Sequence, residues 1–358
     1  MRTGSKADGE GIQRRPTIND IARLAGVAKG TASYALNGRP GVAEATRARV
    51  LAVAAELGWE PSSAARALSG ARSEAVGLIL ARSPEILAFE PYFMTLISGI
   101  EAELSAHGYS LMLRMVGSHE EEVEGYRRWA GRRSVDGVLV QDLRTEDQRI
   151  PVLKELGLPA VLMGISEGAE LPTLQSDEVG AATEVVRYLA ALGHRRLAHV
   201  SGPTMYRHTQ TRVAAFRNAC AEAGIEVTSL ESDYTGEQGA QLTRQLLIAQ
   251  HPPTAVMYDN DVMAVAALGV ARELGRDVPR DLSVIAWDDS PLCRLTHPPL
   301  TAVSHDTPGY GARAVSLLVQ AICGERDTGV HIYEVPRLLP RGTTAPPRMA
   351  ARERDGST

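Results

Sequence analysis

Residues 16–37 read PTINDIARLAGVAKGTASYALN, and this stretch predicts two short helices joined by a tight turn. Thr17 followed three residues later by Asp20 is a capping-box pattern, in which a hydroxyl and a carboxylate satisfy amides left free at a helix start. Gly26 supplies the turn, and Lys29–Leu36 follows as the second helix. Two helices at this spacing are typical of a helix-turn-helix, whose second helix reads the DNA major groove.

The apolar residues of this region predict that a third helix completes a small core. Ile21, Leu24 and Ala25 recur at helical spacing and give the first helix one apolar face. A third amphipathic helix is expected over Glu44–Leu57, with an inner face made of Val50, Val53, Ala54 and Leu57. Residues 16–60 are therefore interpreted as an all-α DNA-binding domain. A small helical bundle with no DNA role is the alternative.

Ordered sets of residues run through this segment: Thr17-Ile18-x-Asp20-Ile21-Ala22-x-x-Ala25-Gly26-Val27, then Thr31-x-Ser33-x-x-Leu36-Asn37, then Val42-x-x-x-Thr46-Arg47-x-x-Val50, then Ala55-x-Leu57-Gly58-Trp59-x-Pro61, and finally Ala64, Arg66, Leu68 and Gly70. With these sets the segment resembles the amino-terminal DNA-binding module of the LacI/GalR family of bacterial transcription regulators. The chain departs from the family pattern at Ala28 and Ala43, which stand where a Ser or Thr usually caps a helix.

The resemblance implies that the second helix and its approaches contact DNA. Lys29 can reach guanine O6 and N7 or a phosphate, and small hydroxyls can meet base edges or phosphates. Gly30 offers no side chain at a position that usually reads a base, and Tyr34 can reach a phosphate or pack on the third helix. The predicted contacts before the hinge are Thr17, Asn19, Lys29, Gly30, Thr31, Ser33, Tyr34 and Asn37.

Residues 61–72 are interpreted as a hinge helix and linker. Pro61 favours a helix start and Gly70 a stop, with an alanine-rich stretch between them. So short a helix is marginal alone in water, and the resemblance implies that it forms on DNA beside its dimer mate. Ala64 and Leu68 are its predicted DNA contacts, and Leu68 matches the leucine that wedges into the minor groove. An ordinary linker whose Leu68 packs on the core is the alternative.

The composition indicates a folded protein with a basic amino-terminal end. The chain has 358 residues, enough for two or three domains, and its 44% of hydrophobic residues supports a sizeable core. Residues 1–72 hold eleven Lys/Arg and six Asp/Glu, whereas the whole chain carries a formal charge of −5, so phosphate attraction is localised to one end. Residues 1–15 lack a signal-peptide core and are expected to form a disordered arm, which favours a cytoplasmic location without a membrane partner.

No catalytic or metal motif competes with this interpretation. The chain has no Gly-x-Ser-x-Gly elbow, Walker loop, His-Glu-x-x-His helix or dinucleotide glycine fingerprint. Asp288 and Asp289 are adjacent strand residues that face opposite sides, so they cannot easily share a metal. Cys220, Cys293 and Cys323 are far apart and are expected to be buried reduced thiols. We therefore expect no enzyme activity, no catalytic or metal site and no cofactor.

Residues 73–345 alternate short apolar runs with helical stretches. Strands are expected over 76–80, 109–115, 137–140, 160–163, 197–201, 226–230, 255–257 and 284–287, and helices over 92–107, 120–131, 145–156, 209–224, 237–250 and 261–274. Continuous apolar strands joined by helices predict parallel sheets covered on both faces. The predicted fold class is α/β, with the all-α head followed by two doubly wound lobes. Residues 346–358 have no apolar heptad and are expected to form a flexible tail.

The family resemblance extends over these lobes. Matching residues include Gly99-Ile100-Glu101, Asp136-Gly137-Val138, Leu192-Gly193-His194, Arg212-x-x-Ala215-Phe216, Asn260-Asp261-x-Met263-Ala264 and Arg341-Gly342-Thr343-Thr344. The resemblance implies an effector-binding and dimerisation domain like a type I periplasmic sugar-binding protein. Its chain would cross between the lobes near Leu174–Ser176, Ser304–Asp306 and Tyr333–Val335.

A cleft at the carboxyl ends of the strands is the usual ligand position in such a fold. A polar ligand there needs paired hydrogen bonds from charged or amide groups. The resemblance implies that the effector contacts are Tyr92, Phe93, Arg212, Asn260, Asp288 and His305. Gly164 stands where many sugar-responsive members carry an Asp, which leaves the class of effector open, and Trp287 is expected to pack in the core.

Together these features predict a homodimeric transcription regulator. The main hypothesis is a repressor that a small, carbohydrate-like effector releases from a palindromic operator. Corepression and activation stay open, because the sign of coupling depends on which lobe arrangement favours the hinge helices. A stand-alone sugar-binding protein is the alternative from another class. Residues 16–70 and the missing export segment discriminate against that alternative.

Overall fold

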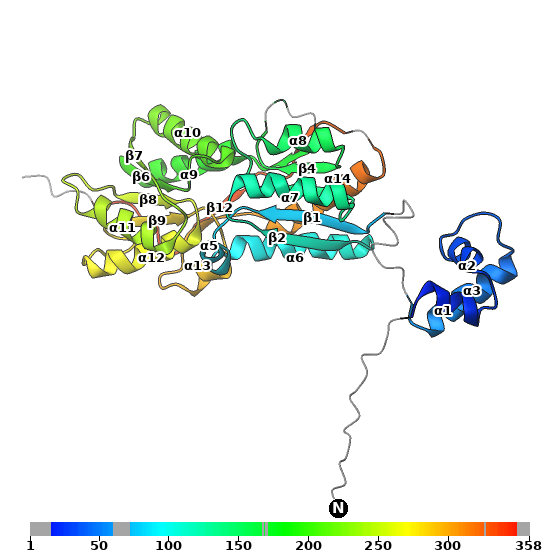
Figure 1. Cartoon of the computed structure of the whole chain (residues 1–358). Coiled ribbons are helices and arrows are strands. Elements are labelled where there is room, and N and C mark those ends of the chain that lie inside the picture. The colour runs from blue at the N-terminus through cyan, green and yellow to red at the C-terminus, as the bar shows by residue number, and fades with distance from the viewer. Residues whose placement is uncertain (1–15, 60–71, 167, 169–170, 326, 349–358) are drawn as a thin grey trace, which may run out of the picture. The chain divides into compact units, whose positions relative to one another are not determined.

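The structure, a computed structural model, describes residues 16–59, 72–166, 168, 171–325 and 327–348. The chain divides into two compact units, residues 1–71 and 72–358 (Figure 1). The expected arm at 1–15, residues 61–71 of the expected hinge with Ala64 and Leu68, and residues 349–358 of the expected tail lie outside the described residues. None of the described helices is long and apolar enough to cross a membrane.

The first unit contains the three helices α1 (Ile18–Leu24), α2 (Lys29–Leu36) and α3 (Glu44–Glu56). Their shared core consists of Ile21, Ala22, Ala25, Ala32, Ala35, Val50 and Ala54. The prediction that Leu24 lies on the inner face is wrong, since 53% of this residue is exposed. Successive helix positions differ by about 100°, so Ile21, Ala22 and Ala25 fill one sector and Leu24 falls on its flank.

The start of α1 is capped as the sequence predicts, whereas α2 and α3 begin without a side-chain cap. The Asp20 carboxylate accepts hydrogen bonds from the backbone N–H and the hydroxyl of Thr17, at 2.9 and 2.7 Å. Gly26, in the turn after α1, has a φ of 65°, which a glycine adopts without strain. Ala28 and Ala43 are the N-caps of α2 and α3, and neither side chain can accept a hydrogen bond from the first amides.

The second unit consists of two lobes, each built on a six-stranded sheet (Figure 1). The strands are β1 (Ala75–Leu80), β2 (Ser110–Met115), β3 (Gly137–Val140), β4 (Ala160–Met163), β5 (Thr173–Gln175), β6 (Arg196–Ser201), β7 (Glu226–Glu231), β8 (Ala255–Tyr258), β9 (Ser283–Ala286), β10 (Thr301–Ser304), β11 (Val330–Ile332) and β12 (Arg337–Leu339). The first lobe has the parallel order β11-β5-β4-β3-β1-β2. The second has the order β12-β10-β9-β8-β6-β7, in which β12 is antiparallel.

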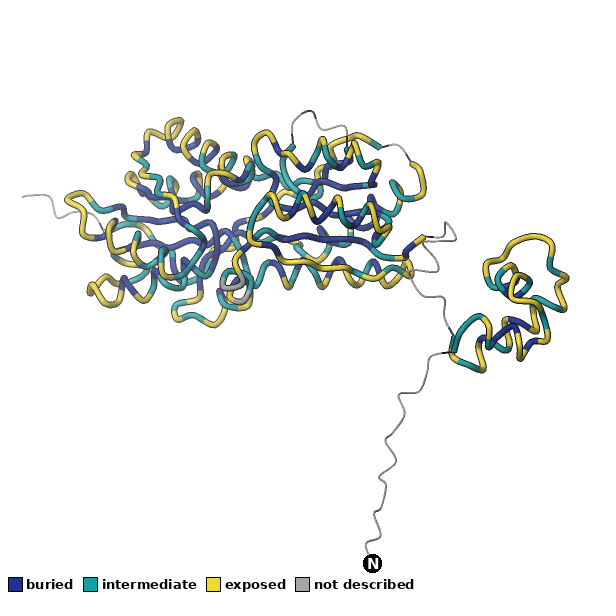
Figure 2. Tube along the Cα trace, viewed as in Figure 1, coloured by how far each residue is buried: buried dark blue, intermediate teal, exposed yellow. Residues whose placement is uncertain are grey.

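Helices cover both faces of each sheet, which confirms the predicted α/β class with two doubly wound lobes. In the first lobe, α6 (Pro91–Ala106) and α14 (Thr307–Ile322) pack on one face, and α7 (His119–Arg132) and α8 (Arg149–Leu156) on the other. In the second lobe, the pairs are α11 (Gly236–Leu247) with α12 (Asp261–Glu273), and α9 (Glu178–Leu192) with α10 (Arg207–Glu222). Short helices α5 (Pro84–Phe89) and α13 (Pro291–Leu295) follow β1 and β9. Figure 2 shows buried strands at the centre of each lobe and exposed residues on the outer helix surfaces.

The chain passes between the lobes three times, at the positions that the sequence predicts. The first passage joins β5, which ends at Gln175, to α9 in the second lobe. The second joins β10, which ends at Ser304, to α14 on the first lobe. The third joins β11, which ends at Ile332, to β12. These connections leave the carboxyl ends of strands from both lobes facing a common space.

Two local predictions are wrong. The helix expected over 145–156 begins only at Arg149, because the Asp147 carboxylate accepts hydrogen bonds from the backbone N–H groups of Arg144 and Arg149, each at 3.0 Å, and forms a turn. Cys323 is exposed, whereas the other two cysteines are buried as expected. Cys323 follows the last residue of α14 and therefore lies past the face that packs on the sheet.

Candidate functional site

A cavity lies between the two lobes of the second unit. It encloses about 810 Å³ of space between atoms, part of which is open to solvent. Its walls include residues at or just after the ends of β1, β3, β4 and β5 in the first lobe and of β8, β9 and β10 in the second. Five of the six predicted effector contacts line it: Tyr92, Phe93, Arg212, Asp288 and His305.

Asn260, the sixth predicted contact, is not among the lining residues. It is the N-cap of α12, where its Oδ1 accepts a hydrogen bond from the backbone N–H of Met263 at 2.9 Å. Its amide donates to the backbone carbonyl of Tyr234 at 3.0 Å. Because Asn260 is fully buried and both halves of its side chain already bond to the backbone, this placement argues against a ligand contact.

The first of two ion pairs in the cavity wall joins Arg82 and Asp142. Nε and Nη2 of Arg82 donate to the two carboxylate oxygens of Asp142 at 2.7 and 3.0 Å. Although burial opposes ionisation, Arg82 holds the pKa of Asp142 below its usual value. The guanidinium also lies 4.4 Å from the ring centroid of Tyr206 and 4.9 Å from that of Tyr234, both in the second lobe. A paired cation of one lobe thus stacks on two aromatic rings of the other.

The second ion pair, Arg212 with Glu178, lies within the second lobe. Nε of Arg212 is 2.5 Å from Oε2 of Glu178. The guanidinium also lies 4.4 Å from the ring centroid of Trp287. The predicted packing of Trp287 in the core is confirmed, since it is fully buried in the cluster between α9, α10 and the sheet. Trp287 therefore supports Arg212 from the core and does not line the cavity itself.

Two further carboxyl groups, Glu90 and Asp288, line the cavity from opposite lobes. Glu90 precedes α6 in the first lobe, is 8% exposed, and has no hydrogen-bond partner for its Oε2 among the described residues. Burial raises the pKa of Glu90 to about 7, against the opposing effect of Arg82. Asp288 follows β9 in the second lobe, and burial together with nearby Asp261 holds its pKa well above the usual value. Both groups thus pay a desolvation cost without a cation of their own.

The two histidines that line the cavity add no positive charge to it at neutral pH. His208 and His305 line it, and burial lowers the pKa of each to about 4. His305 Nε2 donates to the backbone carbonyl of Trp287 at 3.2 Å. His199 lies behind the wall, with Nε2 2.8 Å from Oδ1 of the lining residue Asp259.

The first lobe supplies an aromatic wall and an unusual backbone position. Gln141 donates its side-chain amide to the hydroxyl of Tyr92 at 3.1 Å, and the rings of Tyr92 and Phe93 pack edge to face. Gly164 has a φ of 127°, a conformation that L side chains rarely adopt. A Cβ at Gly164 would meet only Leu143, at an ordinary 3.8 Å. The backbone conformation, rather than lack of space, therefore explains the glycine at this position.

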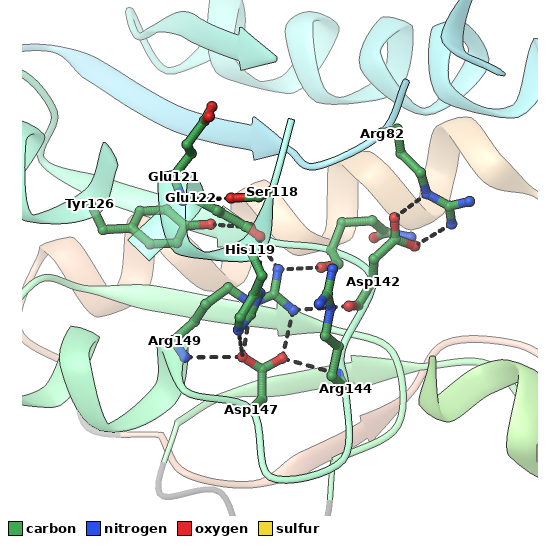
Figure 3. A network of polar contacts seen from close by, with 11 residues as sticks. Arg82, Ser118, His119, Glu121, Glu122, Tyr126, Asp142, Arg144, Asp147 and Arg149 are labelled. Carbon is green, nitrogen blue, oxygen red and sulfur yellow. Dashed lines mark hydrogen bonds and ion pairs between the residues drawn. The ribbon is translucent and has the colours of Figure 1, made fainter. Parts of the chain in front are cut away.

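A buried ion network holds the loop that carries Gln141 and Asp142 (Figure 3). Arg149, at the start of α8, donates to the backbone carbonyls of Gln141 and Asp142 at 2.8 and 2.9 Å. The same guanidinium donates to Glu122 at 2.6 Å and to both oxygens of Asp147 at 2.9 and 2.6 Å. All three side chains of this ion network are at least 98% buried, so loss of Arg149 would leave two buried carboxylates with only the imidazole of His119 as a basic group nearby. Arg149 thus fixes a loop that lines the cavity.

In the first unit, the predicted DNA contacts lie on α2 and near the start of α1. Asn19, Lys29, Gly30, Tyr34 and Asn37 are exposed, and Thr17, Thr31 and Ser33 are partly exposed. Tyr34 is 47% exposed and is not part of the helical core, so it does not pack as a core residue on α3. Asn37, the C-cap of α2, donates its side-chain amide to the backbone carbonyl of Ser33 at 2.8 Å.

Sequence reasoning missed six charged residues of the cavity wall: Arg82, Glu90, Asp142, Glu178, Asp259 and Glu334. Arg82 and Asp142 stand two residues after the ends of β1 and β3. Polar residues directly after buried parallel strands gather on the ligand side of such a fold, so this position was a usable signal for both. Glu178 begins a helix that the sequence analysis had not assigned.

Comparisons with known proteins bear on both units. Residues 17–62 match the family described as "Bacterial regulatory proteins, lacI family", and residues 186–344 match the family described as "Periplasmic binding protein-like domain". The HTH-type transcriptional regulator CelR of Thermobifida fusca is 34% identical over 337 residues, which cover 92% of this chain and 98% of CelR.

Two solved structures extend the likeness to the fold. The structure described as "transcriptional regulator CelR-cellobiose complex" is 32% identical, with a TM-score of 0.70, and covers 92% of this chain and all of that chain. The Lac repressor dimer bound to operator and the anti-inducer ONPF is 27% identical, with a TM-score of 0.81, and covers 93% of this chain and all of that chain.

Proposed function

Because this chain belongs to the lacI family of bacterial regulatory proteins, we propose that it represses genes from a palindromic operator and that a small polar effector bound between its lobes releases it. Like these relatives, it is a DNA-binding transcription regulator and not an enzyme. The observation that carries the proposal is the presence, in one chain, of a helix α2 with an exposed polar face and an interlobe cavity with charged walls. Action on the chromosome makes a cytoplasmic location part of the same proposal.

The proposed operator contacts are the exposed and partly exposed residues of the first unit together with the hinge. They are Thr17, Asn19, Lys29, Gly30, Thr31, Ser33, Tyr34, Asn37, Ala64 and Leu68. In a dimer two recognition helices lie about one helical turn apart, so the operator is a palindrome of about 14–20 base pairs.

A homodimer is supported by apolar residues exposed on the first lobe. Strand β2 is an edge strand, and its Met112, Leu113 and Met115 are 36%, 38% and 54% exposed. Phe89 at the end of α5 and Met94 in α6 of the same lobe are 74% and 64% exposed. Exposed apolar residues on a sheet edge mark a surface for another chain, and the related Lac repressor was solved as a dimer.

A carbohydrate is the proposed class of effector. The cavity offers the aromatic pair Tyr92 and Phe93 and the polar groups Arg212, Asp288 and His305, and the related CelR was solved with cellobiose. Apolar walls with a few convergent polar groups suit a sugar, which presents hydroxyls at its edges and C–H groups on its faces.

A footprint of the full chain on the DNA beside its own gene tests the proposal. Wild-type protein should protect a palindrome, and titration with candidate sugars should abolish the protection. Lys29→Ala should weaken it by removal of a base or phosphate contact. Arg244→Ala, which removes only an exposed ion pair with Glu273 on the second lobe, is the control. Absence of a protected palindrome would refute the regulator, whereas protection that sugars strengthen would make it a corepressor-type regulator.

A further inference from the structure

The cavity is lined by more carboxyl groups than its cations can pair with. Six carboxyl groups line it, against two guanidinium groups. The guanidinium groups are already engaged, Arg82 with Asp142 and Arg212 with Glu178. The lining histidines add no charge near neutral pH, because burial lowers the pKa of both to about 4.

Two of the remaining carboxyl groups have partners within the protein. Asp259 lies 2.8 Å from His199 and accepts a hydrogen bond from the backbone N–H of Gly202 at 3.0 Å. Glu334 accepts a hydrogen bond from the backbone N–H of Asp306 at 2.9 Å. Only Glu90 and Asp288 among the lining carboxyls therefore remain to be explained.

Neither Glu90 nor Asp288 has a cation partner among the described residues. Glu90 is 92% buried, and its Oε2 has no hydrogen-bond partner although it lies in the cavity wall. No hydrogen bond to the carboxylate of Asp288 is present in the described part of the chain, and the charge of Glu90 itself disfavours ionisation of Asp288. A desolvated carboxyl oxygen without a partner is costly to the folded protein. Oε2 of buried Glu90 and the carboxylate of partly buried Asp288 are therefore best explained by a ligand that supplies the missing donors.

We propose that the effector of this cavity carries no anionic group and donates hydrogen bonds to Glu90 and Asp288 at the same time. This inference rests on the proposed function and narrows its effector to unphosphorylated, donor-rich molecules, namely neutral polyols or amines. Because Glu90 belongs to the first lobe and Asp288 to the second, one ligand that bonds both holds the lobes together. A phosphate or carboxylate placed there would meet the buried carboxyl of Glu90, the partly buried carboxyl of Asp288 and no unpaired guanidinium.

Three β-1,4-linked disaccharides provide the test. They share one ring skeleton, and their substituents make them neutral, cationic or anionic. Calorimetry on the full chain compares cellobiose, its di-glucosamine analogue and cellobiose 6-phosphate. We expect the neutral or the cationic sugar to bind at least about tenfold more tightly than the phosphate. Glu90→Gln and Asp288→Asn should each weaken the bound sugar by a similar factor, and Glu124→Gln, an exposed residue on α7, is the matched control.

A proton-release measurement distinguishes the two proposed ligand classes, neutral polyols and amines. At pH 7 a cationic sugar that ionises Glu90 should release protons, which calorimetry in buffers of different ionisation enthalpy detects, whereas cellobiose should release few. Tightest binding of the phosphate, or binding unaffected by both substitutions, would overturn the proposal.

If none of the three sugars binds, ligand-free unfolding decides. If the two carboxyl groups serve a ligand, they destabilise the ligand-free protein, and Glu90→Gln and Asp288→Asn should raise the unfolding midpoint at pH 8. A lowered midpoint would mean that these carboxyl groups have structural partners, and it would overturn the proposal. The operator footprint of the control variant Glu124→Gln should match that of the wild type. A wild-type protein that protects no operator would refute the proposed function, and the sugar comparison and the unfolding data would still test the charge preference of the cavity.

Discussion

Replacement of Glu90 by Gln should stabilise the ligand-free protein, and by an amount that depends on pH. Glu90 precedes α6, is 8% exposed, and leaves Oε2 without a hydrogen-bond partner among the described residues. Burial raises its pKa to about 7 from an ordinary value of 4.5, and the charges of Asp142 and Asp261 add to the rise, while Arg82 and Asn260 oppose it. Gln has nearly the same shape and cannot ionise.

The size and sign of the effect follow from proton linkage. Below pH 4.5 the carboxyl of Glu90 is protonated in both the folded and the unfolded state, so the wild type and the Glu90→Gln variant should differ little. Between pH 4.5 and 7 the folded state holds more protons than the unfolded state, and the free energy of unfolding of the wild type therefore falls as the pH rises. Above pH 7 the cost is complete, at about 3 kcal/mol for a shift of about 2.5 pKa units.

Urea unfolding at pH 5, 6, 7 and 8, followed by far-UV circular dichroism, measures this difference. The advantage of Glu90→Gln should grow from near zero at about pH 4.5 to about 3 kcal/mol at pH 8. Glu124→Gln, on the exposed side of α7, should show no such trend. A difference between Glu90→Gln and wild type that is independent of pH, or a variant less stable than wild type at pH 8, would refute the reasoning.

Four further changes should have distinct effects. Leu68→Ala should weaken operator binding by about 1–3 kcal/mol and spare binding to random DNA, because a wedge acts only on bent DNA. Gel shifts on both DNAs measure this, and equal losses would mean that Leu68 is a packing residue. Arg149→Met should lower the free energy of unfolding in urea by about 3–5 kcal/mol, since it leaves the buried carboxylates of Glu122 and Asp147 without their arginine, whereas exposed Arg127→Met should change it little. Arg212→Ala should abolish release by the effector and leave ligand-free operator affinity near normal, and a variant that responds as wild type would exclude this cavity as the regulatory site. Ala28→Ser should raise the unfolding midpoint of the head by supplying the missing cap of α2, worth about 1 kcal/mol, and an unchanged midpoint would show that the first amides are satisfied otherwise.

The parts of the fold that the sequence predicts are those with strong local patterns. The two sets of apolar runs gave the central strands of both lobes, because buried parallel strands are continuously apolar. Strands β5 and β11 have three residues each, too few to show a period, and they became visible only through their partners in the sheet. Helix α14 packs on the first lobe although it follows the second in sequence, and no local pattern states which lobe a returning helix covers.

Neighbouring residues at the site show where local reasoning stops. Asp288 and Asp289 do point to different surroundings as predicted, but not through strand alternation, because β9 ends at Ala286 and both residues follow it. Arg341 donates to Asp289 at 2.8 Å, so this carboxyl is neutralised by a residue 52 positions later, whereas Asp288 enters the cavity. Asn260 shows the reverse: its residue type suits a ligand contact, yet its position makes it the N-cap of α12. Which polar side chain remains for a ligand is decided by the distant partners that satisfy the others, and those partners come from tertiary structure.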